Sequence, residues 1–162
     1  MITLVLGGAR SGKSDVAERM AAAAGGAVTY VATGTAVDAD MAARIEEHRR
    51  RRPAGWTTVE SGADLPAALA RAEGTVLVDA LGTWLAGAAD LAVDADALCA
   101  ALAGRSGDTV VVSDEVGLGV HPSTEAGRRF RDALGTLNRR VADLADRVVL
   151  VVAGRVLPLE RA

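Results

Sequence analysis

Short apolar runs alternate with longer helical patterns along the whole chain. The apolar runs are rich in strand-forming residues and fall at residues 2–6, 28–32, 75–78, 109–113, 148–152 and 155–159. A further short extended segment is expected at residues 56–60. The patterns between these runs predict helices at residues 15–24, 41–52, 65–72, 95–103 and 123–145.

This alternation predicts an α/β fold with a mostly parallel sheet and helices on both faces. The run at 109–113 is almost continuous valine, which is typical of a strand covered on both sides. Ala153 and Gly154 separate the last two runs and predict a C-terminal hairpin. No linker, repeat or low-complexity tract divides residues 1–162, so we expect a single domain.

The segment between the first strand and the first helix carries the clearest chemistry. It reads Gly-Gly-Ala-Arg-Ser-Gly-Lys-Ser and matches the pattern G-x-x-x-x-G-K-[ST]. In that pattern backbone N–H groups converge on a polyphosphate, the lysine reaches the β- and γ-phosphates, and the last hydroxyl binds Mg²⁺. A chance glycine-rich turn is the alternative, and the flanking strand and helix argue against it. The expected nucleotide-binding residues are Gly7, Gly8, Ala9, Arg10, Ser11, Gly12, Lys13 and Ser14, with Lys13 also catalytic.

Carboxylates follow two of the predicted buried strands. Asp79 ends the strand at 75–78, where a P-loop protein holds Mg²⁺, so Ser14 and Asp79 form the expected metal site. Asp114 and Glu115 follow the strand at 109–113 and could orient a hydroxyl or act as a general base. The alternative for each is an ordinary cap or a hydrogen bond to the next loop.

The predicted helix at 41–52 carries a histidine among arginines. Arg44 precedes His48 by four residues, and Arg51 and Arg52 follow it by three and four, so all share one side of the helix. Nearby guanidinium groups favour a neutral imidazole, which is a nucleophile, and they would hold a triphosphate beside it. A solvated arginine-rich face with an incidental histidine fits the same spacing, and spacing alone favours it.

Composition narrows the class of protein further. Half of the residues are hydrophobic and 2% are aromatic, so alanine, valine and leucine must build the core. The formal net charge of −3 argues against a general nucleic-acid binder. The single cysteine, Cys99, excludes an internal disulfide. We expect three residues to be packing residues, namely Cys99, Trp56 and Trp84. His121 is expected to lie in a surface turn. There is no basic leader and no apolar stretch near the ~20 residues of a membrane span, which predicts a cytoplasmic protein without such a span.

Several motifs occur in an order that resembles a known family. They are Gly-Gly-Ala-Arg-Ser-Gly-Lys-Ser (7–14), Tyr-Val-Ala-Thr (30–33), Met-Ala-Ala-Arg-Ile-x-x-His (41–48), Trp-x-Thr-x-Glu (56–60), Asp-x-Leu-x-x-Trp-Leu (79–85), Glu-Val-Gly-x-Gly (115–119) and Phe-Arg-Asp-x-x-Gly-x-x-Asn (130–138). The chain from residue 1 to about residue 159 resembles the bifunctional adenosylcobinamide kinase/adenosylcobinamide-phosphate guanylyltransferases of cobalamin biosynthesis.

The resemblance implies a RecA-like P-loop fold, a trimer and two reactions. The aminopropanol hydroxyl of a corrinoid, adenosylcobinamide, is phosphorylated from ATP or GTP; GMP then passes from GTP, through a guanylyl-histidine, to the cobinamide phosphate. The histidine of the motif corresponds to His48, which would make the arginines a triphosphate clamp. Besides residues 7–14, the resemblance implies nucleotide contacts from Ala32, Thr33, Gly34, Arg49, Arg50, Arg51, Arg52, Glu60, Asp79 and Glu115.

The chain departs from the family pattern at a few positions. Asp114 stands where the family usually has asparagine, and a charge there changes the contacts open to a hydroxyl or a phosphate in the kinase step. Arg139 replaces a glutamine, His121 replaces an apolar residue, and the loops between residues 85 and 96 are short.

Two other functions fit part of the pattern. One is a small P-loop kinase of another metabolite that makes no use of His48. The other is a nucleotide-dependent switch or binding module with no small-molecule acceptor, which would need a basic or apolar partner surface.

Overall fold

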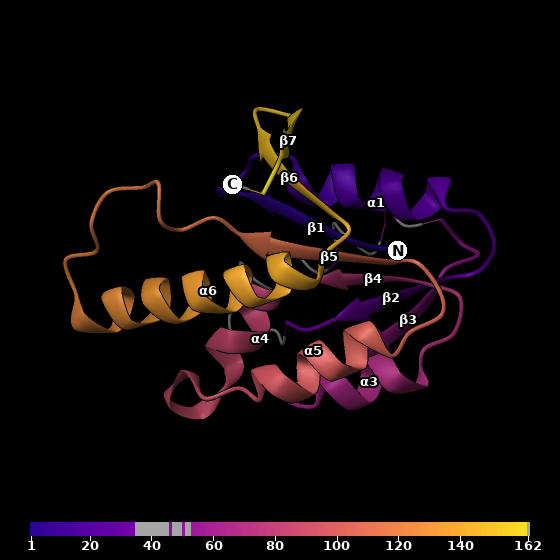
Figure 1. The fold of residues 1–162 in the computed structure, drawn as a ribbon, viewed down its shortest axis with the longest axis horizontal. Coiled ribbons are helices and arrows are strands. Elements are labelled where there is room, and N and C mark those ends of the chain that lie inside the picture. Colours follow the sequence, from indigo (N-terminus) through magenta and orange to yellow (C-terminus); the bar gives the residue numbers. More distant parts are fainter. Residues whose placement is uncertain (35–45, 47–49, 51–52, 162) are drawn as a thin grey trace.

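A mostly parallel β-sheet forms the centre of the molecule (Figure 1). The computed structural model describes residues 1–34, 46, 50 and 53–161. Over these residues the sheet has seven strands in the order β3-β2-β4-β5-β1-β6-β7, and only β7 runs antiparallel to its neighbour. The strands are β1 (Ile2–Gly7), β2 (Val28–Ala32), β3 (Thr57–Glu60), β4 (Thr75–Asp79), β5 (Thr109–Asp114), β6 (Arg147–Val152) and β7 (Arg155–Leu159).

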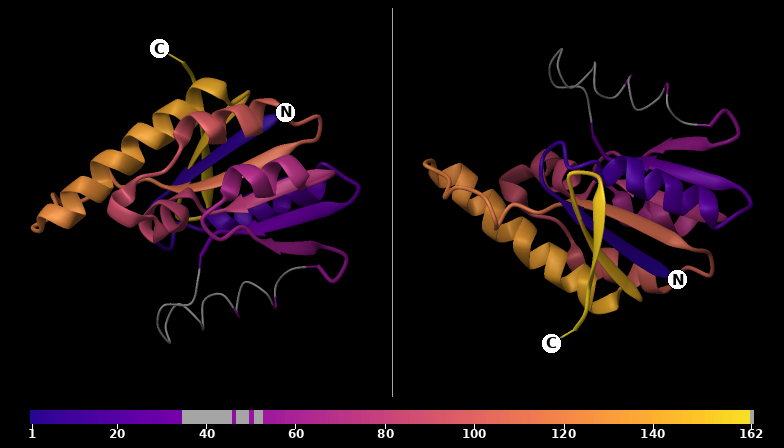
Figure 2. Two further views of the ribbon diagram at one scale, coloured as in Figure 1. Left: turned by 90° about the horizontal axis from the view of Figure 1, so that it is seen from below. Right: turned by 90° about the horizontal axis from the view of Figure 1, so that it is seen from above.

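Helices cover both faces of this sheet. Helix α1 lies on one face and α3, α4, α5 and α6 lie on the other (Figures 1 and 2). Their bounds are α1 (Lys13–Ala23), α3 (Leu65–Arg71), α4 (Leu81–Gly87), α5 (Ala95–Ala103) and α6 (Glu125–Leu144), with a 3-10 turn, η1 (Ala89–Leu91), between α4 and α5. None of the helices within the described ranges combines the length and the apolar character that crossing a bilayer requires.

Alternation along each strand divides the core into two layers. In β1, Leu4 and Leu6 pack in the cluster that contains leucines of α3, α5 and α6, whereas Val5 packs in the cluster that contains Val16 and Ala17 of α1. Each strand therefore needs apolar residues at successive positions, which explains the continuous valine of β5. The same alternation turns Asp79 and Asp114, at the ends of β4 and β5, toward the α1 side of the sheet.

The strand and helix predictions that fall within the described residues are confirmed, with small shifts at the ends. The segments 28–32 and 95–103 match β2 and α5, and the C-terminal hairpin is present. Helix α3 begins as expected, with Asp64 accepting a hydrogen bond from Ala67 N (3.0 Å) and Pro66 in its first turn. The predicted helix at 41–52 lies outside the described residues except for two isolated positions, 46 and 50.

Two expectations need correction. Helix α4 was not predicted, because Gly82, Thr83 and Gly87 are weak helix formers; burial of Leu81 and Trp84 holds it in place. Cys99 is half-buried on α5 and not a core residue, because α5 turns Leu98 and Leu102 inward instead. Trp84 is a packing residue as expected, only 4% exposed, and Trp56 packs at the edge of the α1-side cluster.

Arg105 joins the segments around the N-terminal ends of β4 and β5, opposite the strand ends that carry Asp79 and Asp114. The guanidinium of Arg105 donates to the carbonyls of Leu69, Ala72 and Gly74 and to Thr109 Oγ1. These acceptors come from the end of α3, the turn after it and the start of β5, so one side chain joins these three segments. Burial lowers the pKa of Arg105 from its ordinary value, yet the group stays charged near neutral pH.

We expect Arg105→Ala to lower the free energy of unfolding by about 2–3 kcal/mol, because it leaves several partly buried carbonyls without donors. Arg105→Lys should recover only part of that loss, since an ammonium cannot match the fork of a guanidinium. Urea unfolding followed by circular dichroism measures both.

Arg71→Ala is the matched control, because Arg71 is exposed on the neighbouring helix α3. Its effect should stay within about 0.5 kcal/mol. Equal losses at the two arginines would contradict the structural role given to Arg105.

Candidate active site

The loop between β1 and α1 has the shape that a phosphate-binding loop needs. Gly12 has a φ of +89°, a conformation that favours glycine, and it directly precedes α1. At Gly7 a Cβ would lie 2.4 Å from Ser11 Oγ and 2.9 Å from Val151 O, so only glycine lets the loop fold this closely against β6. The hairpin turn also supports the loop, because Gly154 N donates to Ser11 O at 2.7 Å.

The same loop fits a polyphosphate. The N-cap residue of α1 is Gly12, which has no side chain to cap the helix, so within the described part of the chain the first N–H groups of α1 are available to an anion. Ser11 Oγ is buried and has no hydrogen-bond partner among the described residues. An uncapped helix end beside an unsatisfied hydroxyl is the environment that phosphate oxygens complete.

Lys13 is held in place by two acceptors. Its Nζ donates to Gly8 O at 3.3 Å and forms an ion pair with Asp114 Oδ1 at 2.8 Å. The lysine side chain is 14% exposed and that of Asp114 is 34% exposed. An ammonium group has three donors, so one remains for a phosphate oxygen.

Ser14 and Asp79 come together from α1 and β4. Ser14 Oγ lies 3.5 Å from Asp79 Oδ1, and Tyr30 of the neighbouring strand donates its hydroxyl to Asp79 Oδ2 at 2.7 Å. A hydroxyl and a carboxylate are suitable Mg²⁺ ligands when phosphates supply the rest. Within the described ranges no three His, Cys, Asp or Glu residues gather as a metal cluster, so the candidate metal site is this pair together with a nucleotide.

A buried network fixes the end of β5. Ser113 Oγ donates to Asn138 Oδ1 at 2.6 Å, and Asn138 Nδ2 donates to Asp114 O at 3.0 Å. Glu115 N then donates to Gly7 O at 3.0 Å. Asp114 is therefore positioned by α6 on one side and by the phosphate-binding loop on the other.

The other residues predicted to contact the nucleotide near the ends of β2 and β3 differ in burial and in hydrogen bonding. The hydroxyl of Thr33 hydrogen-bonds to both backbone groups of Ala80 (2.9 and 2.6 Å) and to Thr83 Oγ1 (2.6 Å), so it secures the start of α4. Ala32 and Gly34 flank it and are half-buried, and Glu60 is exposed at the end of β3, paired in register with Ala32.

Other candidates have local partners or lie outside the described part of the chain. The Glu115 carboxylate accepts from Gly117 N at 2.6 Å, which fits its alternative role within its own loop. His121 is exposed and pairs with Arg131 at 2.8 Å, as expected of a surface residue. Arg50 is exposed and pairs with Glu46, and the exposed Ala9 and Arg10 lie at the tip of the loop. His48, Arg49, Arg51 and Arg52 lie outside the described residues.

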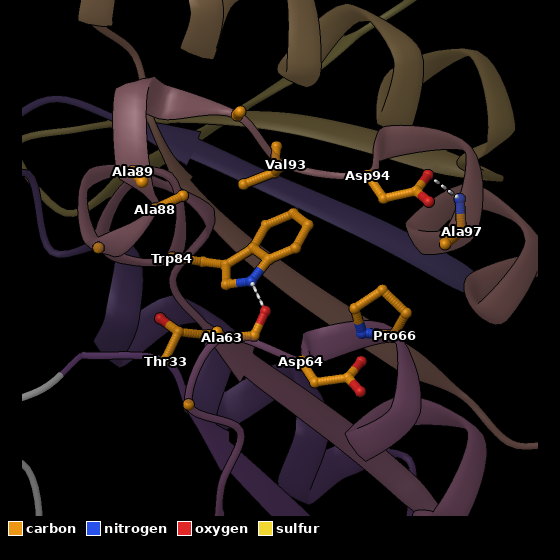
Figure 3. Close-up of a pocket in the computed structure, with 13 residues that line it drawn as sticks. Thr33, Ala63, Asp64, Pro66, Trp84, Ala88, Ala89, Val93, Asp94 and Ala97 are labelled. Atoms are coloured by element: carbon orange, nitrogen blue, oxygen red, sulfur yellow. Dashed lines mark hydrogen bonds between the residues drawn. The ribbon is translucent and has the colours of Figure 1, made fainter.

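A cavity of about 520 Å³ opens beside Thr33, at the edge where β2, β3 and β4 end (Figure 3). Its walls are mainly apolar and come from the start of α3, from α4 and from the connection to α5. The indole of Trp84 reaches across toward Ala63 and donates to its carbonyl oxygen at 2.9 Å (Figure 3). Such a lining suits an apolar part of an organic ligand better than a phosphate.

Sequence reasoning missed three contributors to this site. Tyr30 was noted only as part of a motif, although its place two residues before the end of β2 turns it to the same face as Asp79. Asn138 and Gly154 act through long-range contacts with β5 and the loop. A known strand order would have revealed the place of Tyr30, and Asn138 closes the motif at 130–138, although that motif does not say what Asn138 contacts.

Together, the loop, the lysine and the Ser14–Asp79 pair on a mostly parallel sheet define a P-loop nucleotide-binding protein. Comparison with known proteins makes the assignment specific. The sequence profile described as cobinamide kinase / cobinamide phosphate guanyltransferase matches residues 3–159, and the chain belongs to this family.

Curated relatives cover nearly the whole chain. The bifunctional adenosylcobalamin biosynthesis protein CobP of Pseudomonas aeruginosa is 44% identical over 99% of this chain and 98% of its own length. The corresponding CobU protein of Salmonella typhimurium is 36% identical over 95% and 97%. Among solved structures, the P4 protein of bacteriophage phi6 in complex with ADP has a TM-score of 0.42 and 16% identity, covering 96% of this chain and 52% of that one.

We expect Tyr30→Phe to lower the apparent affinity for Mg²⁺ in nucleotide binding about tenfold or more, because the phenol orients the Asp79 carboxylate. Titration of Mg²⁺ against a fluorescent nucleotide measures this. Thr29→Val is the control, since it removes a hydroxyl from the same strand that bonds to Glu73 O instead. An equal effect in both variants would refute a specific role for the phenol.

Proposed function

We propose that this chain catalyses both reactions of its family: phosphorylation of adenosylcobinamide, then formation of adenosylcobinamide-GDP from GTP. The observation that carries the proposal is an intact phosphate-binding loop, with Lys13 and the Ser14–Asp79 pair, in a chain matched by the family profile almost from end to end.

In the kinase reaction the acceptor hydroxyl attacks the γ-phosphorus and the nucleoside diphosphate leaves. The loop N–H groups and the remaining donor of Lys13 bind the β- and γ-phosphate oxygens, whose charge grows in the transition state. Mg²⁺, held by Ser14 and Asp79, would supply further charge neutralisation. Catalysis then depends mostly on position, which a rigid loop between β1 and α1 provides.

In the transferase reaction His48 attacks the α-phosphorus of GTP and pyrophosphate leaves. A phosphate oxygen of cobinamide phosphate then attacks the same phosphorus, and the imidazole is released. Arg49, Arg50, Arg51 and Arg52 would neutralise the phosphates during both displacements. Ala32, Thr33, Gly34, Glu60 and Glu115 are proposed contacts of the nucleotide.

The proposed setting follows the resemblance. The substrate partner is a corrinoid and not a nucleic acid, and a large corrinoid needs apolar surface close to the phosphates; the cavity beside Thr33 is such a surface at the same edge of the sheet. We propose a homotrimer working in the cytoplasm, with ATP or GTP as phosphate donor and GTP as guanylyl donor.

The intact mass of the protein after incubation with GTP and Mg²⁺ tests the histidine step. We expect a gain of one GMP that is acid-labile and that disappears in His48→Ala. The variant should still bind nucleotide through the loop.

Absence of the adduct from both proteins, with nucleotide still bound, would refute the transferase and leave a P-loop kinase or switch. Turnover of cobinamide to cobinamide phosphate would then show that the first reaction is retained without the second, and its absence would leave a kinase of another metabolite or a switch.

A further inference from the structure

Asp114 lies directly beside the phosphate-binding lysine. Its Oδ1 lies 2.8 Å from Lys13 Nζ, and β5 presents it next to Gly7 in the register of the sheet. We propose that Asp114 is the general base of the kinase step, accepting the proton of the acceptor hydroxyl. This inference rests on the proposed function and concerns its first reaction only.

The geometry of the ammonium group supports this role. Lys13 already binds Gly8 O and Asp114 Oδ1, so a γ-phosphate oxygen takes its third donor. Two acceptors on one tetrahedral ammonium lie about 4.5 Å apart. A hydroxyl oxygen bound between them would lie within hydrogen-bond distance of the carboxylate and about 3–3.5 Å from the phosphorus.

The carboxylate is held in this position from several sides. Asn138 Nδ2 fixes the backbone of Asp114 at 3.0 Å, and the buried Ser113 hydroxyl fixes Asn138 in turn. On the side away from Lys13, the Oδ2 atom faces Gly82 at the start of α4, where a Cβ would come within 2.4 Å of it. Gly82 therefore leaves the space that the carboxylate fills.

The proton balance assigns Asp114 to one reaction only. In the kinase step the O–H bond of the acceptor breaks as its oxygen bonds to phosphorus; the proton passes to Asp114 and then to solvent, and the nucleoside diphosphate keeps the electron pair of the broken P–O bond. In the transferase, the attacking imidazole nitrogen and the attacking phosphate oxygen carry no proton. The asparagine usual in the family at this position could orient a hydroxyl but could not take its proton, so a base here is particular to this chain.

Asp114→Asn is the direct test, with both half-reactions measured in the same preparation. We expect the kinase kcat to fall ten- to a hundredfold, with the KM of the nucleotide little changed, because positioning and charge neutralisation remain. Loading of GMP from GTP, followed by intact mass, should proceed at the wild-type rate. Asp132→Asn, on the exposed side of α6, is the matched control and should leave both reactions unchanged.

Gly82→Ala tests position without changing charge. The new methyl group would displace the Asp114 carboxylate, so we expect at least a tenfold loss of kinase kcat with GMP loading preserved. Raising the nucleotide concentration should not restore the kinase rate of either Asp114→Asn or Gly82→Ala.

Each other outcome overturns the assignment. Unchanged kinase kcat in Asp114→Asn, with or without tighter nucleotide binding, would mean that the carboxylate only competes with phosphate for Lys13. Loss of both reactions would mean that it acts through the position of Lys13. Absence of kinase turnover in the wild-type protein would refute the proposed kinase itself. Kinase turnover in the wild type that is unchanged in Asp114→Asn would refute only the role of Asp114 as the base.

Discussion

The site depends on how closely backbone can approach backbone where β1 ends. A Cβ at Gly7 would collide with the β6 carbonyl of Val151 and with the Ser11 side chain, so only glycine allows this approach. That contact curls the loop so that its N–H groups and the start of α1 face one point. Lys13 and Ser14 then take their places because they open the helix, and the carboxylates of the neighbouring strands meet them there.

A parallel sheet supplies these carboxylates without any special loop. Strands β4 and β5 end on the same edge as β1, and alternation sends Asp79 and Asp114 to the face that α1 covers. Tyr30 of β2 then fixes the side chain of Asp79, and Asn138 of α6 fixes the backbone of Asp114. The two acidic groups thus contact different members of one short sequence, Lys13-Ser14, and can serve different parts of the chemistry.

Local pattern predicted most of the fold and the phosphate-binding loop. The strand at 28–32 and the helix at 95–103 were predictable because apolar periodicity and flanking turn residues agree there. Helix α4 was not, since its residues form a helix only when Leu81 and Trp84 find the core. The Lys13–Asp114 and Tyr30–Asp79 contacts depend on strand order and register, which no single segment encodes.

The hydrogen bond from Gly154 to Ser11 joins the phosphate-binding loop to a part of the chain that the ribosome makes much later. A ribosome makes the phosphate-binding loop between β1 and α1, but the amide that braces it follows only after β6. A nascent chain therefore carries the loop sequence long before it carries the brace. The backbone support of the loop is therefore complete only when the terminal hairpin has joined the sheet.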